Sequence, residues 1–238
     1  EWANTLRLWG ALPKTLLDLQ RFNAGDYAAA AAPEALARTI SRVLYPDDTT
    51  EEGKHLRLKQ EFFFTAASLR DLLRRFEDEH TDWRDLPKKV AIQLNDTHPA
   101  IAGPELVRLL HYERGIDFDD AVDIARGCLN YTNHTLLPEA LERWSDGLMG
   151  YLLPRHLQLI ERIDAAHRSQ HPGVAIREHG EVKMGELSFI MANRVNGVSA
   201  LHSDLMKVTV FKDLHQMHPD RIVNQTKGVT PRRWLRTC

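Results

Sequence analysis

Short apolar runs alternate with longer amphipathic segments along this sequence. Residues 89–94 form such a run, which ends in the polar sequence Asn95-Asp96-Thr97-His98-Pro99. The pattern fits a short buried strand, and residues 129–132 form a second run of this kind. A third and weaker candidate strand lies within residues 186–195. Strands that alternate with helices are typical of a parallel sheet, so the sequence predicts the α/β fold class.

Apolar residues recur at helical spacing in three segments, which are residues 33–44, 56–76 and 104–114. Each of these helices is expected to bury its apolar stripe. Gly53 should precede the second helix, and Gly115 should end the third. Asp117 is a suitable N-cap for a further helix. Residues 147–171 are also helical in pattern, but Pro154 lies inside them and should break or kink the helix.

The composition limits the class of protein. The chain has 238 residues, 43% hydrophobic and 27% charged, which is typical of one large or two small globular domains. Its 31 basic and 33 acidic residues show no excess that would indicate a nucleic-acid partner. Two cysteines form no disulfide framework and predict a cytoplasmic, reducing compartment, and no apolar run is long enough for a membrane helix. Both ends of the sequence resemble cuts rather than natural termini.

Polar clusters follow the first two predicted strands. Ligands of open α/β sheets bind at the carboxyl ends of strands, so Asp96, His98 and His134 are candidate site residues. Asp96 and His98 could hydrogen-bond a polyol, or Asp96 could cap the next helix while His98 is a structural loop residue. His134 could bind a substrate hydroxyl or be an ordinary satisfied polar residue. Asp and His also bind metals, but no third ligand stands at a telling spacing, so no metal site is predicted.

Common nucleotide and hydrolase motifs are absent from the sequence. No GxGxxG follows a strand, and there is no Walker A loop, no GxSxG and no HExxH. Arg74 and Arg75 stand at the end of a predicted helix, where they could complement the helix dipole or hold an anionic ligand.

Many segments of the chain resemble, in the same order, the α-glucan phosphorylases that act on glycogen, starch and maltodextrin. The matching segments are 4–9 (NTLRLW), 41–48 (SRVLYPDD), 53–61 (GKHLRLKQE), 92–99 (IQLNDTHP), 131–135 (YTNHT), 138–144 (PEALERW), 153–158 (LPRHLQ), 195–198 (VNGV), 201–203 (LHS) and 228–234 (GVTPRRW). They cover nearly the whole chain, and residues 45–50 look more like a bacterial glycogen phosphorylase than an animal one.

The resemblance implies a fold and an activity. The family has the GT-B arrangement, two Rossmann-like domains facing each other across a deep cleft. Residues 1–238 resemble the later part of the N-terminal domain, ending near the start of the C-terminal domain. The implied reaction transfers a terminal glucosyl unit of an α-1,4-glucan to inorganic phosphate, giving glucose 1-phosphate with retention. The implied cofactor is pyridoxal phosphate, held as a Schiff base by a C-terminal lysine, and the implied assembly is a homodimer.

The resemblance also assigns roles to residues. His134 matches the family histidine beside the reacting sugar, which bonds the primary hydroxyl and turns its backbone carbonyl toward the developing positive charge. Asp96 and His98 match residues lining the pocket beside the anomeric centre, and Val229 belongs to a substrate-site motif. Lys227 departs from the family, which usually has asparagine there, and it adds a positive charge near the expected cleft.

Residues 47–49 match the mobile gate of the family's active site. Asp48 matches the gate acid, and Arg57 matches the arginine that can replace this acid in the phosphate pocket, an exchange that prepares an anion site. The cofactor lysine is expected outside this chain, so the chain alone is expected to be inactive. The alternative hypothesis is a non-catalytic module that binds glucan or serves assembly.

Overall fold

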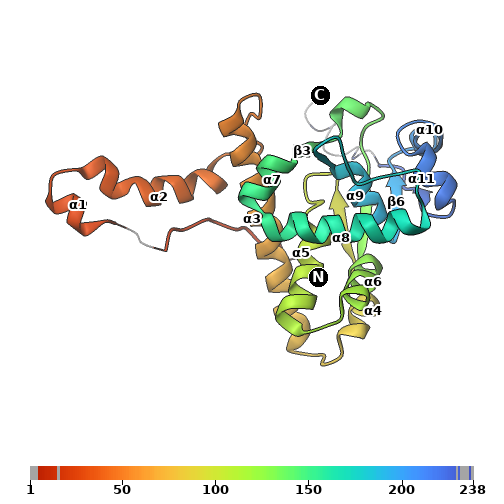
Figure 1. Cartoon of the computed structure of the whole chain (residues 1–238), viewed down its shortest axis with the longest axis horizontal. Coiled ribbons are helices and arrows are strands. Elements are labelled where there is room, and N and C mark those ends of the chain that lie inside the picture. Colours follow the sequence, from red (N-terminus) through yellow and green to blue (C-terminus); the bar gives the residue numbers. More distant parts are fainter. Residues whose placement is uncertain (1–4, 15–16, 229, 231–235, 237–238) are drawn as a thin grey trace. The chain divides into compact units, whose positions relative to one another are not determined.

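The computed structural model describes residues 5–14, 17–228, 230 and 236 (Figure 1). The chain divides into two compact units, which we call unit 1 (residues 1–79) and unit 2 (residues 80–238). No helix among the described residues is long and apolar enough to cross a membrane.

Unit 1 is helical and consists of α1 (Leu19–Asn23), α2 (Tyr27–Arg42) and α3 (Glu51–Glu77). Helix α2 begins earlier than predicted, because the Asp26 side chain accepts a hydrogen bond from the Ala29 backbone N–H. Pro33 therefore lies inside this helix. The predicted buried stripe is wrong: Leu36 is exposed, and Ala30 is the helix's buried residue.

Helix α3 begins at Glu51, so Gly53 lies in its first turn rather than before it. A side chain at Gly53 would place its Cβ 2.1 Å from the backbone oxygen of Asp47, so only glycine allows the preceding loop to lie this close. The predicted stripe is confirmed at its C-terminal end, where Leu69, Leu73 and Phe76 are buried.

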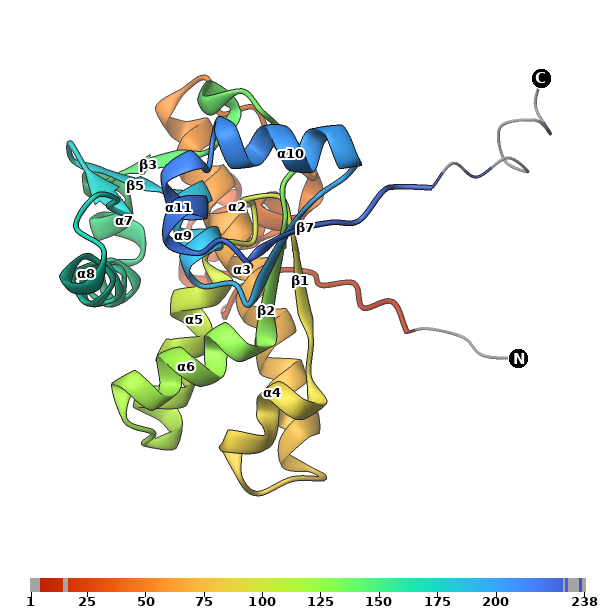
Figure 2. The same ribbon diagram turned by 90° about the vertical axis from the view of Figure 1, so that its right-hand side faces the viewer.

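The main sheet of unit 2 confirms the predicted fold class. It has four parallel strands in the order β1 (Ile92–Asn95), β2 (Leu129–Thr132), β6 (Arg194–Gly197) and β7 (Ile222–Asn224) (Figure 2). Leu94, Tyr131, Val195 and Ile222 lie in register across the sheet, and all four are buried. This row of side chains forms the centre of the core.

Helices surround this sheet: α4 (Leu86–Lys89), α5 (Ala102–Arg108), α6 (Phe118–Cys128), α7 (Asp146–Leu152), α8 (Pro154–Gln170), α9 (Met184–Ile190), α10 (Ala200–Val208) and α11 (Lys212–Met217). Helix α5 contacts both α6 and α8, and Figure 1 shows α8 running across unit 2. The N-cap at Asp117 is confirmed, since its carboxylate accepts from the Asp119 N–H. The break at Pro154 is also confirmed, because α7 ends before it and α8 begins there.

Two predictions about unit 2 need correction, and several strands were not predicted. The helix predicted over 104–114 is α5 followed by a π-helical turn, η2 (Leu109–Glu113). The first half of the weak strand candidate 186–195 is helix α9, and only its end belongs to β6. An antiparallel sheet of β3 (Arg143–Ser145), β5 (Glu181–Lys183) and β4 (Arg177–Glu178) was not predicted, nor was β7. Two 3₁₀ turns, η1 (Trp83–Asp85) and η3 (Pro138–Ala140), complete the described elements.

Candidate functional site

Polar side chains gather where the parallel strands of unit 2 end, and His134 lies among them. The residue follows β2 on the segment after Thr132. Its Nε2 lies 2.6 Å from Oδ1 of Asn95, the last residue of β1. Its Nδ1 lies 2.9 Å from Nζ of Lys227, which follows β7. Residues from three different strand ends therefore meet at this imidazole.

These two contacts fix the tautomer of His134. An ammonium group can only donate, so Nδ1 accepts the hydrogen bond from Lys227. In a neutral ring the other nitrogen then carries the proton, and Nε2 donates to Asn95. Burial, and next the positive charge of Lys227, hold the pKa of His134 below its ordinary value. The ring is thus neutral at physiological pH, with both nitrogens engaged.

A row of hydrogen bonds across the sheet supports this edge. Thr132 donates from Oγ1 to Oδ1 of Asn196 over 2.8 Å. The amide of Gln93 donates to Oγ1 of Thr132 over 2.9 Å and to Oδ1 of Asn196 over 3.3 Å. Three neighbouring strands are therefore tied together by side chains as well as by their backbones, which favours a fixed position for His134.

Asp96 lies in the turn directly after β1. Its φ of 65° is in the left-handed region, which Asp tolerates better than most residues. Its carboxylate accepts a hydrogen bond from the Thr97 N–H over 2.7 Å, and its own N–H donates to the carbonyl of Thr132. Helix α5 has Ile101 at its N-cap position with no side-chain hydrogen bond, so the alternative that Asp96 caps this helix is wrong.

His98 and its neighbour Thr97 share one carboxylate. Nδ1 of His98 lies 3.0 Å from Oε1 of Glu142, and Oγ1 of Thr97 donates to Oε2 of the same residue over 2.9 Å. Glu142 lies just before β3, far along the chain, and was not among the predicted site residues. Its side chain holds the loop that carries His98, so Glu142 acts on the site through another residue.

In unit 1 the structure brings Asp48 and Arg57 together. The two side chains form an ion pair of 3.4 Å, and Nε of Arg57 donates to the carbonyl of Pro46 over 3.1 Å. The guanidinium also lies 3.8 Å from the centre of the Tyr45 ring, a cation–π contact. Arg57 is buried, while Asp48 is only half-buried, so the acid is the more accessible partner.

Gln60 holds the start of this loop in place. Its amide donates to the carbonyls of Ile40 and Val43 at the end of α2, and its Oε1 accepts from the Tyr45 N–H. Val229, the remaining predicted site residue, lies outside the described residues.

Lys54 and Lys227 do not fit a Schiff base with pyridoxal phosphate. Nζ of Lys54 lies 2.7 Å from a carboxylate oxygen of Glu51, and this hydrogen bond is the main cause that raises the pKa of Lys54. Imine formation needs an unprotonated amine, so this environment opposes it. Nζ of Lys227 is engaged with His134.

Arg74 and Arg75 lie in the last turn of α3, where their positive charges interact favourably with the negative end of the helix dipole. Both pair with Asp71, at 3.2 Å and 3.1 Å, and Arg74 also pairs with Asp78. These ion pairs support the structural alternative for the two arginines.

The sequence matches the family model described as carbohydrate phosphorylase over residues 1–238. The chain belongs to the carbohydrate phosphorylase family. It is 46% identical to the human brain form of glycogen phosphorylase, over 99% of this chain and 30% of that protein. It is 47% identical to glycogen phosphorylase of Chlamydia trachomatis and 44% to cytosolic alpha-glucan phosphorylase 2 of Arabidopsis thaliana, over 98% of this chain and 30% of each relative.

These comparisons bear on the alternatives left open by the sequence. The chain spans about 30% of the length of the curated relatives it matches. The relatives named here are all phosphorylases, which does not favour a non-catalytic glucan-binding module. The bacterial and human relatives are about equally similar to this chain.

Proposed function

We propose that this chain is part of an α-glucan phosphorylase. The whole protein transfers a terminal glucosyl unit to inorganic phosphate and releases glucose 1-phosphate with retention. Membership of the family and the names of the relatives support this activity. The parallel α/β unit supports a Rossmann-like part of a GT-B fold, within the later part of the N-terminal domain.

The rest of the proposal concerns the whole protein. The resemblance to the family implies that a C-terminal domain outside this chain holds pyridoxal phosphate, and the engagement of Lys54 and Lys227 is compatible with this. The assembled protein is a cytoplasmic homodimer whose partners are glucan and phosphate.

The observation that carries the proposed site is the neutral His134 fixed between Asn95 and Lys227. A neutral ring adds no positive charge beside a sugar that develops positive charge during glycosyl transfer. Among the described residues, none donates a hydrogen bond to the backbone carbonyl of His134, so this dipole is left for the substrate. We assign His134 as the catalytic residue of this chain.

Asp96, His98 and Val229 are proposed to bind the substrate. The carboxylate of Asp96 and the imidazole of His98 follow β1, the strand that neighbours β2 and its His134. Both are half-buried polar groups that can hydrogen-bond sugar hydroxyls. Val229 keeps its assignment from the resemblance alone.

The pair Asp48 and Arg57 is proposed to act as a gate for phosphate. In the structure the guanidinium is neutralised by the acid and held by the Pro46 carbonyl. When Asp48 moves away, a phosphate dianion can take the place of its carboxylate beside the guanidinium of Arg57. The gate therefore exchanges one anion for another at Arg57.

The test of the catalytic assignment uses the full-length protein. His134→Ala should lower turnover on the order of 10²-fold or more, with a smaller change in the Michaelis constant for glucan, because the lost contact acts mainly in the transition state. The control is His179→Asn, an exposed histidine on a turn with φ of 53° that asparagine also tolerates. Unchanged turnover in His134→Ala refutes the assignment.

The gate is tested by phosphate dependence. Arg57→Ala should weaken phosphate binding most, and Asp48→Ala should change the phosphate affinity because it removes the competing carboxylate. Matched controls are Arg38→Ala and Glu51→Ala, which remove exposed members of helical ion pairs in the same unit. If both gate variants keep the parent's phosphate dependence, the exchange does not occur.

A further inference from the structure

Unit 2 has a pocket at the end of the main sheet opposite to the end where His134 lies. It has a volume of about 380 Å³ and is lined by residues of α6, the end of α8 and the segments that lead into β6 and β7. Arg221 directly precedes β7, and Ile190 precedes β6. Because the strands are parallel, this pocket lies at their amino ends, whereas His134 lies at their carboxyl ends.

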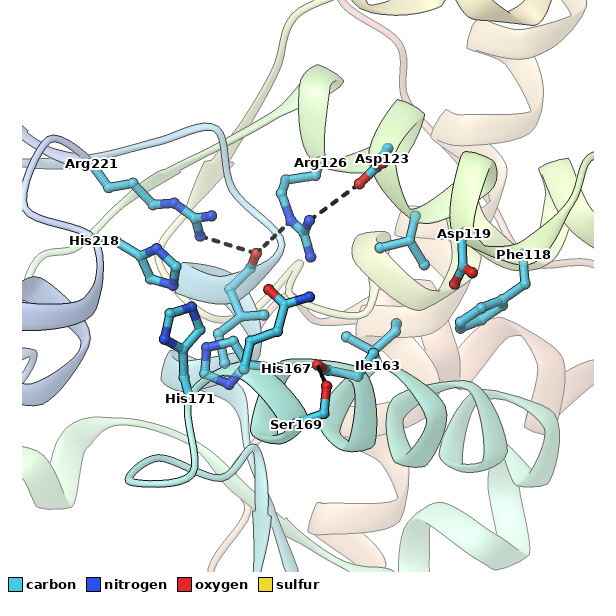
Figure 3. A pocket seen from close by; sticks show the side chains of 14 residues that line it. Phe118, Asp119, Asp123, Arg126, Ile163, His167, Ser169, His171, His218 and Arg221 are labelled. Atoms are coloured by element: carbon cyan, nitrogen blue, oxygen red, sulfur yellow. Dashed lines mark hydrogen bonds and ion pairs between the residues drawn. The ribbon is translucent and has the colours of Figure 1, made fainter.

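Two guanidinium groups converge in this pocket, which we call the arginine–histidine pocket after Arg126, Arg221, His167, His171 and His218. Arg126 donates from Nε to the carbonyl of Ile190 over 3.1 Å, and Arg221 donates from Nη1 to the same carbonyl over 3.2 Å (Figure 3). Two positive charges therefore share one neutral acceptor.

Of these two guanidinium groups, only that of Arg126 has a counterion among the residues that the structure describes. Arg126 pairs with Asp123 at 3.3 Å. Within the described part of the chain, no carboxylate pairs with Arg221, whose hydrogen bonds go to the carbonyls of Phe189 and Ile190. Burial, and next the charge of Arg126, lower the pKa of Arg221 to about 10. The lining also contains the carboxylates of Asp119 and Asp123, so the positive charge that lacks a partner is local to the buried guanidinium of Arg221.

Three imidazoles stand beside the guanidinium of Arg221 (Figure 3). The ring centres of His171 and His218 are 4.8 Å apart, and those of His167 and His171 are 5.1 Å apart. His167 is only 9% exposed, yet neither of its ring nitrogens has a hydrogen-bond partner among the described residues, and the same holds for Nε2 of His218. Buried polar groups are normally satisfied, so these nitrogens indicate a missing ligand.

We propose that the arginine–histidine pocket binds a small phosphate-bearing anion, either inorganic phosphate or a phosphate ester of a small sugar. Phosphate oxygens accept hydrogen bonds from guanidinium and from imidazole N–H groups, which supplies partners for Arg221, His167 and His218. A metal cation is disfavoured, because the two guanidinium groups face the same space.

The size of the pocket favours the ester over the bare ion. A volume of about 380 Å³ falls within the range of small-molecule sites and exceeds the need of a single phosphate group. Phe118 and Ile163 supply an apolar wall on one side. Since the site is far along the strands from His134, it is separate from the proposed catalytic site.

The test measures binding at the histidines themselves, because the proposed catalytic site also takes phosphate. The ring resonances of His167, His171 and His218 in the full chain are assigned by single His→Gln variants and followed by NMR. Inorganic phosphate and ribose 5-phosphate are titrated separately to about 20 mM, which detects binding weaker than millimolar. We expect a saturable shift of these resonances with at least one of the two probes.

A charge variant separates specific binding from general salt effects. Gln170 lines the pocket at the end of α8, so Gln170→Glu should weaken binding about tenfold by adding a negative charge without removing a buried group. Gln158→Glu adds the same charge on an exposed position of the same helix away from the pocket and should leave binding unchanged.

The outcomes decide whether the pocket binds a phosphate group and whether its ligand is an ester or the free ion. Saturation by ribose 5-phosphate at lower concentration identifies an ester site, and saturation by inorganic phosphate alone identifies an ion site. Absence of a saturable shift with either probe overturns the proposal. Equal weakening by Gln170→Glu and Gln158→Glu also overturns it, since the charge effect is then not local.

Discussion

Glu105 is the most completely buried carboxylate in unit 2, and its removal should destabilise the protein strongly. The side chain has no exposed surface. It accepts two hydrogen bonds from Arg108, of 2.7 Å from Nε and 3.0 Å from Nη2. A third bond of 2.7 Å joins it to Nε2 of His156, which is also buried. Glu105 thus connects α5, which follows the loop of His98, to α8.

The expected magnitude follows from these contacts. Removing one partner of a buried charge pair costs about 3–5 kcal/mol. Here the three hydrogen bonds to Arg108 and His156 are lost, while Arg108 keeps its ion pair with Glu113. We therefore expect Glu105→Ala to lower the free energy of unfolding by about 3–5 kcal/mol. Glu105→Gln keeps the shape and one acceptor, so its cost should be about 1–3 kcal/mol.

The loss should depend on pH. Burial pushes the pKa of Glu105 upward, but hydrogen bonds from His156 and Arg108 outweigh it and hold the pKa below its ordinary value. The carboxylate therefore contributes its full stability above the ordinary glutamate pKa, and this contribution is lost as the pH falls through the lowered native value. The difference between the parent and Glu105→Gln should be constant near neutral pH and shrink in acid.

Urea unfolding followed by tryptophan fluorescence measures these differences. The matched control is Glu113→Ala, which removes the other carboxylate on Arg108, at 2.9 Å but partly exposed. It should cost about 1 kcal/mol or less. The reasoning is refuted if Glu105→Ala costs no more than Glu113→Ala at neutral pH.

Three further perturbations have direct expectations. Lys227→Met should raise the pKa of His134, since the lysine charge is the second cause that lowers it; an unshifted NMR titration of this ring contradicts the tautomer assignment. Gly53→Ala should lower the free energy of unfolding in urea by about 1–3 kcal/mol, because the new Cβ displaces the loop at Asp47, whereas Gly10→Ala has open space around its Cβ and should change this free energy little. Equal losses in the two variants contradict the close approach of the loop to Gly53. Burial raises the pKa of the Cys128 thiol to about 12, so a disulfide reagent should label this thiol only at the rate of unfolding, measured in a variant whose terminal cysteine is replaced by serine. Fast labelling of the folded protein contradicts the burial of Cys128.

Local signals in the sequence predicted the elements that local chemistry determines. The strand at residues 129–132 has the predicted bounds, because an apolar run this short, between a helix and a polar cluster, is too short for another helix and fits a buried strand. Asp117 and Pro154 begin helices for reasons that lie within a few residues of each. Strand β7 is three residues long and is defined by its pairing with β6, which no local pattern contains.

The same limit applies to the candidate site. Asp96, His98 and His134 could be predicted because each follows a strand end, and strand ends can be recognised locally. Glu142 bonds His98 across 44 sequence positions. It lies within the matching segment 138–144, but that match assigned it no role in the site. The ion pair of Asp48 and Arg57 was expected only through the resemblance, since the spacing of nine residues across a loop and a helix start has no meaning in itself.

Lys227 shows how a distant residue sets the chemistry of a site. The resemblance predicts asparagine at this position, and an asparagine amide can either donate or accept a hydrogen bond. Lysine can only donate, so its contact with Nδ1 of His134, 93 positions away, forces the proton onto Nε2. Asn95 completes the arrangement, because its Oδ1 accepts the hydrogen bond from this N–H group. Lysine in place of asparagine at position 227 thus restricts His134 to one tautomer. The positive charge of Lys227 also opposes protonation of the ring, so both the position of the proton and the neutrality of His134 depend on the same contact.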